Sequence, residues 1–324
     1  ILFVGDGMSL PTVAAARIYE GQLHQQSGEE NQLSFEKFPY TAFSKTYNTD
    51  SQTPDSAGTM TAMITGAKTR MGFLSVNQIP DRGDCAASLK NPLISAVTLA
   101  ELAGLATGVV TTTRITHATP AATYAHSPER NWESDADMPD TAKQQGCKDI
   151  AQQLIEYSAG NGLEVVMGGG LNKFLPKGSY PNYNNTKGSR ADGRNLIAEW
   201  TTKNPSATFV STGSQLAKIN IADTKKIYGL FNGDHLNFDY DRVTEKLDEP
   251  SLADMTKTAI NLLSKNKKGY LLVVEGGRID HAHHGGNAFR ALTDTVAFSD
   301  AIAMANTMTS DKDTLIIVTA DHSH

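Results

Sequence analysis

Two short segments near the end of the chain combine carboxylate and imidazole side chains at spacings that could bind a metal ion. Asp280 and His284 are four residues apart, so on a helix they lie on one face and can bind one cation. Asp321 and His322 form a second pair, and adjacent residues at the end of a strand can both turn toward one ion. One carboxylate with one imidazole is a donor set that suits zinc. A solvated, histidine-rich turn is the alternative interpretation of the first pair.

Asp6 is a third candidate ligand because it lies between two glycines, which let the backbone approach a bound ion closely. Gly-Asp-Gly is also a common turn sequence, and by itself it predicts nothing more. The position of Asp6 at the end of a predicted strand indicates a ligand site more strongly than the Gly-Asp-Gly sequence does. Asp6, Glu275 and Asp321 each follow an apolar run typical of a strand, and ligands of open α/β sheets bind beyond the carboxyl ends of the strands. These side chains are therefore expected at one edge of a sheet.

Ser56 is the candidate nucleophile. It follows Pro54 and Asp55 and precedes small residues and a helical run, so it is expected at the start of a helix. A lone Asp-Ser pair is most simply an N-cap. The alternative is a serine whose phosphate ester would bind the free N–H groups and positive end of that helix. Metal coordination could activate its hydroxyl without a histidine base, and no Gly-x-Ser-x-Gly sequence surrounds it, which argues against an α/β-hydrolase triad.

The elements that must position these residues alternate along the chain between short β-branched runs and longer amphipathic segments. The near-continuous apolar character of the short runs predicts strands buried on both faces. Their alternation with helices predicts a doubly wound, mostly parallel α/β sheet in three α/β/α layers. Strands are expected at residues 1–4, 107–111, 163–167, 227–231, 270–274 and 315–319. Helices are expected at residues 59–65, 93–103, 150–159, 195–202, 252–263 and 288–308, and surface loops at 22–31, 170–194 and 232–248.

Length and composition limit the class of protein. The chain has 324 residues, 39% hydrophobic and 20% charged, which is typical of a globular protein. We expect residues 1–324 to form a single catalytic domain that is incomplete at both ends. The net charge of −6 argues against a nucleic-acid binder, and no apolar run reaches the roughly 18 to 20 residues that cross a bilayer. Cys85 and Cys147 could be two buried thiols or a disulfide, which would indicate an oxidising compartment.

Longer stretches of the sequence resemble the alkaline phosphatase family, in particular its animal-type and related bacterial members. These stretches occur in the family's order along the whole chain, and several are chemically unusual. They are residues 3–8 (FVGDGM), 44–48 (SKTYN), 55–59 (DSAGT), 110–126, 130–137 (RNWESDAD), 145–151 (QGCKDIA), 274–284 (VEGGRIDHAHH) and 319–324 (TADHSH).

The resemblance implies a site with two zinc ions and one magnesium ion. The implied ligands are Asp280 and His284 for the first zinc, Asp6, Asp321, His322 and Ser56 for the second zinc, and Asp6, Thr119 and Glu275 for magnesium. The family's first zinc has one more protein ligand, a histidine downstream of position 324, which the given sequence does not include.

Other positions take supporting roles by the same resemblance. Arg130 would clamp two phosphate oxygens, a task that its planar guanidinium suits and the point charge of lysine does not. The remaining supporting residues are His117 near magnesium, His281 near the phosphate, His324 beside Asp280, and Asp55 beside Ser56. Cys85 and Cys147 match a pair that is disulfide-bonded in animal-type members.

The implied activity is the hydrolysis of phosphate monoesters of small molecules through a phosphoserine at Ser56, with inorganic phosphate as product. A site that contacts the phosphoryl group and ignores the alcohol would accept a broad range of esters. Family members are usually exported homodimers, so a periplasmic or extracellular homodimer is expected. The alternatives are a related phosphodiesterase or sulfatase, and a truncated remnant that binds metal or phosphate without catalysis.

Overall fold

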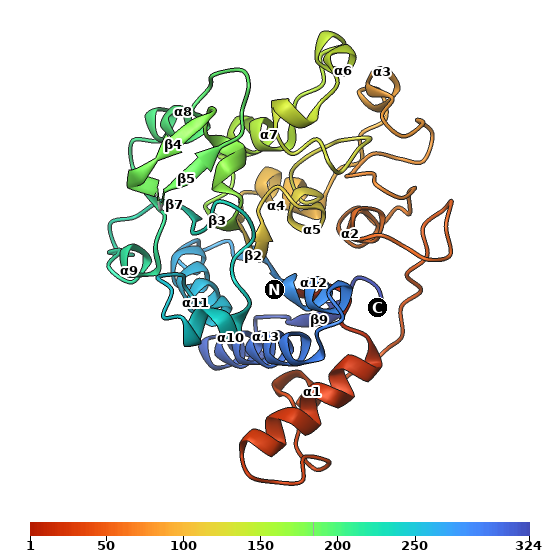
Figure 1. Ribbon diagram of the computed structural model, residues 1–324, viewed down its shortest axis with the longest axis vertical. Coiled ribbons are helices and arrows are strands. Elements are labelled where there is room, and N and C mark those ends of the chain that lie inside the picture. Colours follow the sequence, from red (N-terminus) through yellow and green to blue (C-terminus); the bar gives the residue numbers. More distant parts are fainter. Residues whose placement is uncertain (184) are drawn as a thin grey trace.

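Seven parallel strands form the central sheet of the computed structural model, which describes residues 1–183 and 185–324. The strand order places segments that are distant in sequence next to one another in the sheet, and helices cover both faces (Figure 1). The expected doubly wound, parallel α/β sheet is confirmed. From one edge to the other the strands are β6 (Ala207–Val210), β7 (Lys226–Leu230), β3 (Val165–Gly169), β2 (Ala106–Arg114), β8 (Tyr270–Gly276), β1 (Leu2–Gly5) and β9 (Ile317–Ala320).

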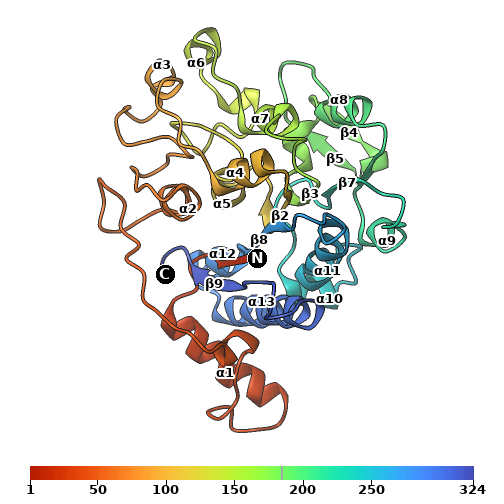
Figure 2. The same ribbon diagram turned by 180° about the vertical axis from the view of Figure 1, so that it is seen from behind.

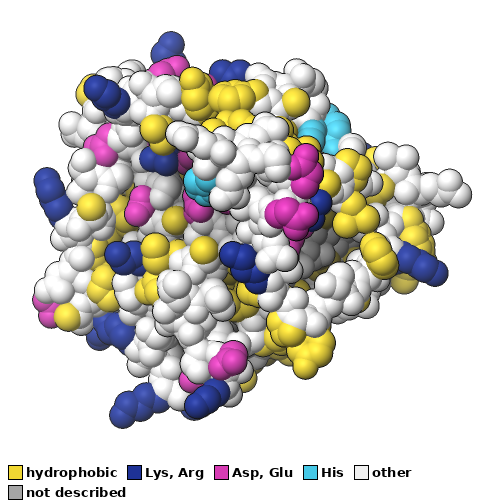
Figure 3. Space-filling view, turned by 90° about the horizontal axis from the view of Figure 1, so that it is seen from below, with side chains coloured by type: hydrophobic (Ala, Val, Ile, Leu, Met, Phe, Trp, Pro, Cys, Tyr) yellow, Lys and Arg dark blue, Asp and Glu magenta, His cyan; other side chains and the backbone are white. Residues whose placement is uncertain are grey.

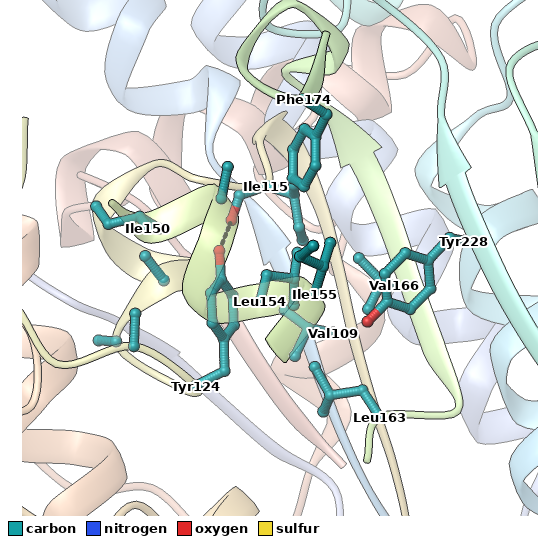
Figure 4. Packing of buried hydrophobic residues seen from close by; sticks show 14 of the residues in the cluster. Val109, Ile115, Tyr124, Ile150, Leu154, Ile155, Leu163, Val166, Phe174 and Tyr228 are labelled. Carbon is teal, nitrogen blue, oxygen red and sulfur yellow. Dashed lines mark hydrogen bonds between the residues drawn. The ribbon is translucent and has the colours of Figure 1, made fainter. Parts of the chain in front are cut away.

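Successive residues of the central strands point into two separate apolar cores, one on each side of the sheet. Val109 and Val273 belong to one core, whereas their neighbours Val110 and Val274 belong to the other. This alternation is the ordinary two-residue period of a strand, and here both faces are apolar because both are covered. Figure 4 shows the first core, where the buried Tyr124 hydroxyl donates a hydrogen bond to the carbonyl oxygen of Ile115 (2.8 Å).

The helices divide between the two faces. The first core contains buried residues of α2, α4, α5, α7 and α8, and the second contains those of α11 and α13. The helices are α1 (Leu10–Leu23), α2 (Ser56–Thr65), α3 (Cys85–Ser88), α4 (Ala96–Ala103), α5 (Ala118–Ala121), α6 (Asp140–Gln144), α7 (Ile150–Glu156), α8 (Leu196–Lys203), α9 (Gly213–Leu216), α10 (Asp239–Thr244), α11 (Leu252–Leu263), α12 (Arg278–His284) and α13 (Ala288–Met308). No helix in the described part of the chain is long and apolar enough to cross a membrane.

Two of the expected surface loops contain regular structure, so those predictions are wrong in part. The 170–194 stretch includes a small antiparallel pair, β4 (Gly178–Tyr180) and β5 (Thr186–Gly188). The 232–248 stretch includes α10. Both elements are short and polar, so they lack the apolar period from which strands and helices are predicted. Strand β6 and helix α1 were not predicted either; α1 projects from the rest of the molecule, as the view from behind shows clearly (Figure 2).

Two covalent or ionic links hold the irregular segments. A disulfide joins Cys85 of α3 to Cys147, with their Cα atoms 5.9 Å apart, which confirms the pairing that the family resemblance implied. Arg190, just after β5, is wholly buried and forms ion pairs with Asp149 (3.0 Å) and Asp192 (2.5 Å). Because Asp149 is also the N-cap of α7, this arginine fixes the segment after β5 to that helix.

Candidate metal centre

The site lies where three neighbouring strands end. β8, β1 and β9 are adjacent in the sheet, and their registers pair Gly5 with both Gly276 and Ala320. The next residues along the three strands are therefore level with one another. This arrangement brings Asp6 and Asp321 side by side just beyond the strand ends, and Glu275, the last residue but one of β8, lies two residues before that level at the same edge, as the sequence predicted.

Ser56 is the first residue of α2, and its hydroxyl faces this edge of the sheet. Its Oγ lies 3.1 Å from Asp6 Oδ1, 3.3 Å from Asp6 Oδ2 and 3.1 Å from His322 Nε2, and the side chain is buried. The N-cap is Asp55, whose Oδ1 accepts a hydrogen bond from the Gly58 N–H (3.1 Å). Asp55 is thus the cap, whereas Ser56 points toward the cluster of acidic residues.

Asp6, Asp321 and His322 form a compact group around the Ser56 hydroxyl. The His322 Nε2 atom is 3.3 Å from Asp6 Oδ1 and 3.5 Å from Asp321 Oδ2. Asp321 Oδ1 accepts hydrogen bonds from the N–H groups of Gly7 (3.1 Å) and His322 (2.8 Å), which fix the orientation of its carboxylate.

Asp280 and His284 lie on one side of α12, as their spacing predicted. Asp280 Oδ2 is 3.3 Å from His284 Nε2, and Asp280 Oδ1 is 3.7 Å from His324 Nε2. The structure therefore does bring His324 next to Asp280. Ligand atoms of these three residues all lie within 4.8 Å of one another, a spacing compatible with one shared metal ion.

A third group surrounds Glu275. Its Oε2 accepts hydrogen bonds from the hydroxyls of Thr111 and Thr113, and Asp6, His117 and Glu275 offer ligand atoms within 4.8 Å of one another. Within the described residues, the Glu275 Oε1 and Thr119 Oγ1 atoms are buried without a hydrogen-bond partner of good geometry. Buried oxygen atoms normally have partners, so this pair fits a bound cation that prefers oxygen ligands.

The electrostatics of the cluster also indicate bound cations. The carboxylates of Asp6, Glu275, Asp280 and Asp321 are each at most 5% exposed. Burial raises the pKa of Asp6 well above its usual range, and the charges of Asp321 and Asp280 raise it further. Burial likewise raises the pKa of Glu275 to about 7. Several acidic groups held this close cannot all ionise unless positive charge is present among them.

Arg130 is placed beside this cluster and not on the surface. Its Nη1 donates to Asp55 Oδ2 (3.0 Å), and its Nη2 lies 3.2 Å from His117 Nε2. The carboxylate of Asp55 thus both caps α2 and holds the arginine next to Ser56. Burial and the nearby Arg130 charge lower the pKa of His117 well below its usual range.

Sequence reasoning missed three residues of this site: Arg114, His235 and Arg278. The rings of His117, His235 and His281 pack edge to face with centroids 4.3 to 5.3 Å apart. Arg114 Nη1 lies 2.7 Å from His235 Nε2, and Arg278 Nη1 lies 3.0 Å from His281 Nδ1. His235 follows β7 by a few residues, so the rule that located the other acidic and imidazole groups, applied to this strand too, would have found it.

The face seen from below carries acidic, basic and apolar side chains interspersed with one another (Figure 3). No large basic area covers this view of the described residues.

Comparison with known proteins gives a consistent result. The family model for alkaline phosphatase matches residues 1–324. The chain is 45% identical over 331 residues to the tissue-nonspecific alkaline phosphatase isozyme of Rattus norvegicus, covering 100% of this chain and 62% of that relative. It thus spans less than two thirds of the length of that protein.

Solved structures are similar as well. The alkaline phosphatase of Thermus thermophilus matches with a TM-score of 0.79 and 30% identity, covering 99% of this chain and 59% of that one. A mutant of the alkaline phosphatase from the Antarctic bacterium TAB5, with Mg bound in its M3 site, matches with a TM-score of 0.72 and 26% identity, covering 99% of this chain and 77% of that one.

Proposed function

The chain belongs to the alkaline phosphatase family, and from this premise we propose that it hydrolyses phosphate monoesters through a phosphoserine intermediate on Ser56. The observation that carries the proposal is the position of the Ser56 hydroxyl. It lies at the first turn of α2, within hydrogen-bond distance of Asp6 and His322, and beside the other three buried carboxylates of the site.

The donor sets fit two zinc ions and one magnesium ion. Asp280 and His284 would hold the first zinc; Asp6, Asp321 and His322 would hold the second; and Asp6, Thr119 and Glu275 would hold magnesium. The buried, unpartnered oxygen atoms of Thr119, Glu275 and Asp280 support this assignment within the described residues. When bound, the metals would supply positive charge to the entering and leaving oxygens and lower the pKa of the groups that they contact.

The protein's own groups would then bind and orient the phosphoryl group. The Ser56 hydroxyl is positioned to donate its proton toward Asp6 Oδ1 as its oxygen attacks phosphorus. The N–H groups at the start of α2 and the guanidinium of Arg130 face the charge that builds up on the phosphoryl oxygens. In the first step the P–Oγ bond forms and the alcohol leaves; in the second, water attacks phosphorus, the P–Oγ bond breaks and inorganic phosphate leaves.

The recognition groups surround Ser56 and would contact only the phosphoryl end of a substrate. We therefore propose a broad range of small-molecule phosphate monoesters, with inorganic phosphate as product and inhibitor. The Cys85–Cys147 disulfide supports export to an oxidising compartment. A homodimer and a single catalytic domain over residues 1–324 are further proposals by analogy with the family.

Hydrolysis of p-nitrophenyl phosphate by the full protein, loaded with zinc and magnesium, tests the proposal. The parent should turn over, and Ser56→Ala should lower kcat by about a thousandfold or more, because removal of a nucleophile leaves only the binding and electrostatic contributions. Acid quenching during turnover should trap a phosphate on the Ser56 peptide, which mass spectrometry can identify. Ser214→Ala, at an exposed serine of α9, is the matched control and should keep full activity.

Two outcomes would contradict the proposal in different ways. If the parent protein, loaded with zinc and magnesium, does not hydrolyse p-nitrophenyl phosphate, the chain is better explained as a remnant that binds metal or phosphate without catalysis. Unchanged turnover in Ser56→Ala would leave the enzyme but remove its assigned nucleophile. A parent that prefers a diester or a sulfate ester would indicate one of the related metalloenzymes.

A further inference from the structure

Arg278 is the first residue of α12, and Gly277 alone separates it from the β8 strand that carries Glu275. Its guanidinium carbon lies 3.8 Å from the ring centroid of Phe238, and its Nη1 lies 3.0 Å from Nδ1 of His281. The backbone N–H of Arg278 donates to Thr112 Oγ1 (3.2 Å). The aromatic ring and the imidazole together hold the guanidinium in one position, while the Thr112 hydroxyl fixes the backbone.

This placement of an arginine is unfavourable in two respects. Within the described residues no carboxylate forms a direct ion pair with Arg278 and its buried Nε has no hydrogen-bond partner, so burial lowers its pKa although the charges of Asp294 and Asp234 partly compensate from a greater distance. A cation in the first turn also opposes the positive end of the helix dipole. The ring of Phe238 compensates in part, because a guanidinium stacks well on an aromatic face. A side chain kept in such surroundings generally does something that a neutral residue could not do.

The contact with His281 decides which ring nitrogen carries the hydrogen. An arginine has only donors, so the hydrogen bond from Nη1 requires that His281 Nδ1 accepts. The hydrogen of the imidazole must then be on Nε2. A ring turned over by 180° would place a carbon atom opposite Arg278, so the same bond also fixes which way the ring faces.

The surroundings of His281 place it beside the proposed phosphate site. Its ring packs against those of His117 and His235, with centroids 5.3 and 4.3 Å away. His117 in turn contacts Arg130, and its ring offers a ligand atom in the group with Asp6. Nothing in the described part of the chain forms a hydrogen bond with His281 Nε2. The Nε2–H group is thus free to donate to a ligand.

We propose that Arg278 is a positioning residue that holds His281 in the orientation and tautomer whose Nε2–H donates toward the substrate phosphoryl group. The tautomer follows from the contact with Arg278 alone. The use of Nε2–H in phosphate binding rests on the proposed phosphatase function of the site.

Imidazole ¹⁵N NMR of the zinc- and magnesium-loaded protein, labelled at its nine histidines, tests the tautomer at alkaline pH, where imidazoles are neutral. The His281 signals are assigned by their loss in His281→Gln. The parent and Arg278→Lys, which keeps a donor-only cation, should show a protonated Nε2 and an unprotonated Nδ1. Arg278→Met, which keeps an apolar chain over Phe238, should show averaged shifts from exchange between tautomers.

Arg290→Met is the matched control. Its guanidinium also lies over Phe238, 5.2 Å from the ring centroid, but it is paired with Asp241 and has no contact with His281 among the described residues. This variant should leave the His281 signals unchanged. If Arg278→Met keeps a single Nε2–H tautomer, or if Arg290→Met disturbs it equally, the positioning role is wrong.

Inhibition by inorganic phosphate tests the use of the donor. Arg278→Met should raise the Ki by about fivefold, as expected for one lost hydrogen bond, whereas Arg278→Lys should stay close to the parent. In a His281→Gln background the amide can still donate a hydrogen bond to phosphate. There Arg278→Met should raise the Ki by less than about twofold, because the imidazole through which the arginine acts is absent. A fivefold effect that persists in that background would mean that Arg278 acts by its charge alone, and would overturn the proposal.

The two measurements fail separately. If the loaded parent binds no phosphate, the proposed function is wrong, and the NMR experiment still decides whether Arg278 controls His281. If the tautomer changes as expected while the Ki does not, His281 is no donor to the phosphoryl group, and that half of the proposal is overturned.

Discussion

Four carboxylates that approach one another in the interior are the central fact at the scale of single residues. Asp6, Glu275 and Asp321 come from three strand ends and Asp280 from helix α12, and each would need several hydrogen bonds to remain charged when buried. Some of their oxygen atoms have such partners, whereas Glu275 Oε1 and Asp280 Oδ1 have no hydrogen-bond partner of good geometry among the described residues. Bound divalent cations would supply the missing partners and cancel the repulsion between the four charges.

Arg130 gives a prediction at this scale. Replacing it with lysine keeps the charge but loses the planar fork that can bind two phosphoryl oxygens at once. We expect Arg130→Lys and Arg130→Ala to raise both KM for p-nitrophenyl phosphate and Ki for inorganic phosphate, by roughly 10- to 100-fold in the alanine variant.

Steady-state kinetics at saturating zinc and magnesium measure the effect of the Arg130 variants. Arg82→Lys is the control, since Arg82 forms a comparable ion pair with Glu129 but is half exposed. Unchanged phosphate inhibition in Arg130→Ala would show that this arginine only holds Asp55.

Asp294 of α13 gives a prediction about pH. Burial raises its pKa to about 8, and the charge of Asp239 adds to the increase. The folded-state value is thus above the unfolded value, so the unfolded chain loses its proton first as pH rises. Stability should therefore fall between about pH 4 and pH 8 because of this group, by at most about 1.4 kcal/mol per pH unit, and level off above that range.

Asp294→Asn removes this dependence while keeping an oxygen that can accept the hydrogen bond from the Asp239 N–H (3.2 Å). The difference in Tm between the variant and the parent should grow in favour of the variant from pH 5 to pH 8. Differential scanning calorimetry of both proteins in the same buffers measures it, and Asp311→Asn, at an exposed position, should show no trend. A constant difference across this range would contradict the raised pKa.

At the scale of elements, the sequence predicted the segments whose apolar period is strong and missed those held by other forces. The predictions at 252–263 and 288–308 match α11 and α13 in full, because each helix carries a long apolar stripe and a clear N-cap at Ser251 or Asn287. The strands β1, β2, β3, β7, β8 and β9 were found to within a few residues, because each is a short apolar, β-branched run; all but the edge strand β9 are largely buried.

The missed elements β4, β5 and α10 have a common physical cause. β4 and β5 are three residues each and pair only with one another, and α10 has no buried residue. Their stability comes from tertiary contacts such as the ion pair between Asp241 of α10 and Arg290 of α13 (2.8 Å). Such contacts join residues distant in sequence, so a local pattern cannot reveal them.

The site shows the same division. The ligands at the ends of β1, β8 and β9 could be predicted from residue type and position, and motif resemblance added Arg130, Thr119 and His117. Arg278 escaped notice because nothing in its local sequence distinguishes a buried cation from a surface one, whereas His235 follows β7 and was missed because the strand-end rule was not applied to that strand.

Arg190 and Arg194 allow a matched prediction at this scale. Both lie in the same connecting segment and form ion pairs, but Arg190 is fully buried with Asp149 and Asp192, whereas Arg194 is about one third exposed with Glu156 and Glu199. Arg190→Met would leave the buried carboxylate of Asp149 without its cation and should destabilise the protein by about 3 kcal/mol. Arg194→Met should cost no more than about 1 kcal/mol.

Urea unfolding followed by circular dichroism measures both arginine variants. Equal losses of stability would show that burial does not determine the strength of these ion pairs. A loss near zero for Arg190→Met would show that methionine packs as well as the ionic network that it replaces.

At the scale of the whole molecule, the parallel sheet gathers into one site residues that are more than 300 positions apart, such as Asp6 and Asp321. Neither end of the chain can form this site alone. Folding must therefore bring the carboxylates together against their mutual repulsion, and metal binding would favour the folded state because the unfolded chain has no such arrangement.

This coupling predicts that metals and folding stability change together. Removal of divalent cations by a chelator should lower the Tm of the parent, and addition of zinc and magnesium should restore it. For one site, a metal concentration of about a hundred times the Kd should raise the free energy of unfolding by about 2.7 kcal/mol. Calorimetry of the chelated and reloaded protein gives the two values of Tm.

Asp6→Asn makes the prediction specific, because Asp6 contributes to both the second zinc site and the magnesium site in our assignment. Without metal, the substitution removes a charge from a repulsive cluster, and the raised pKa of Asp6 indicates that this charge is unfavourable there. The metal-free variant should therefore melt at or above the metal-free parent. With zinc and magnesium the variant should instead melt below the parent, because it has lost a ligand of both the second zinc site and the magnesium site. A variant that melts below the parent in both conditions would show that Asp6 stabilises the fold by its hydrogen bonds, and the coupling between this carboxylate and the metals would be wrong.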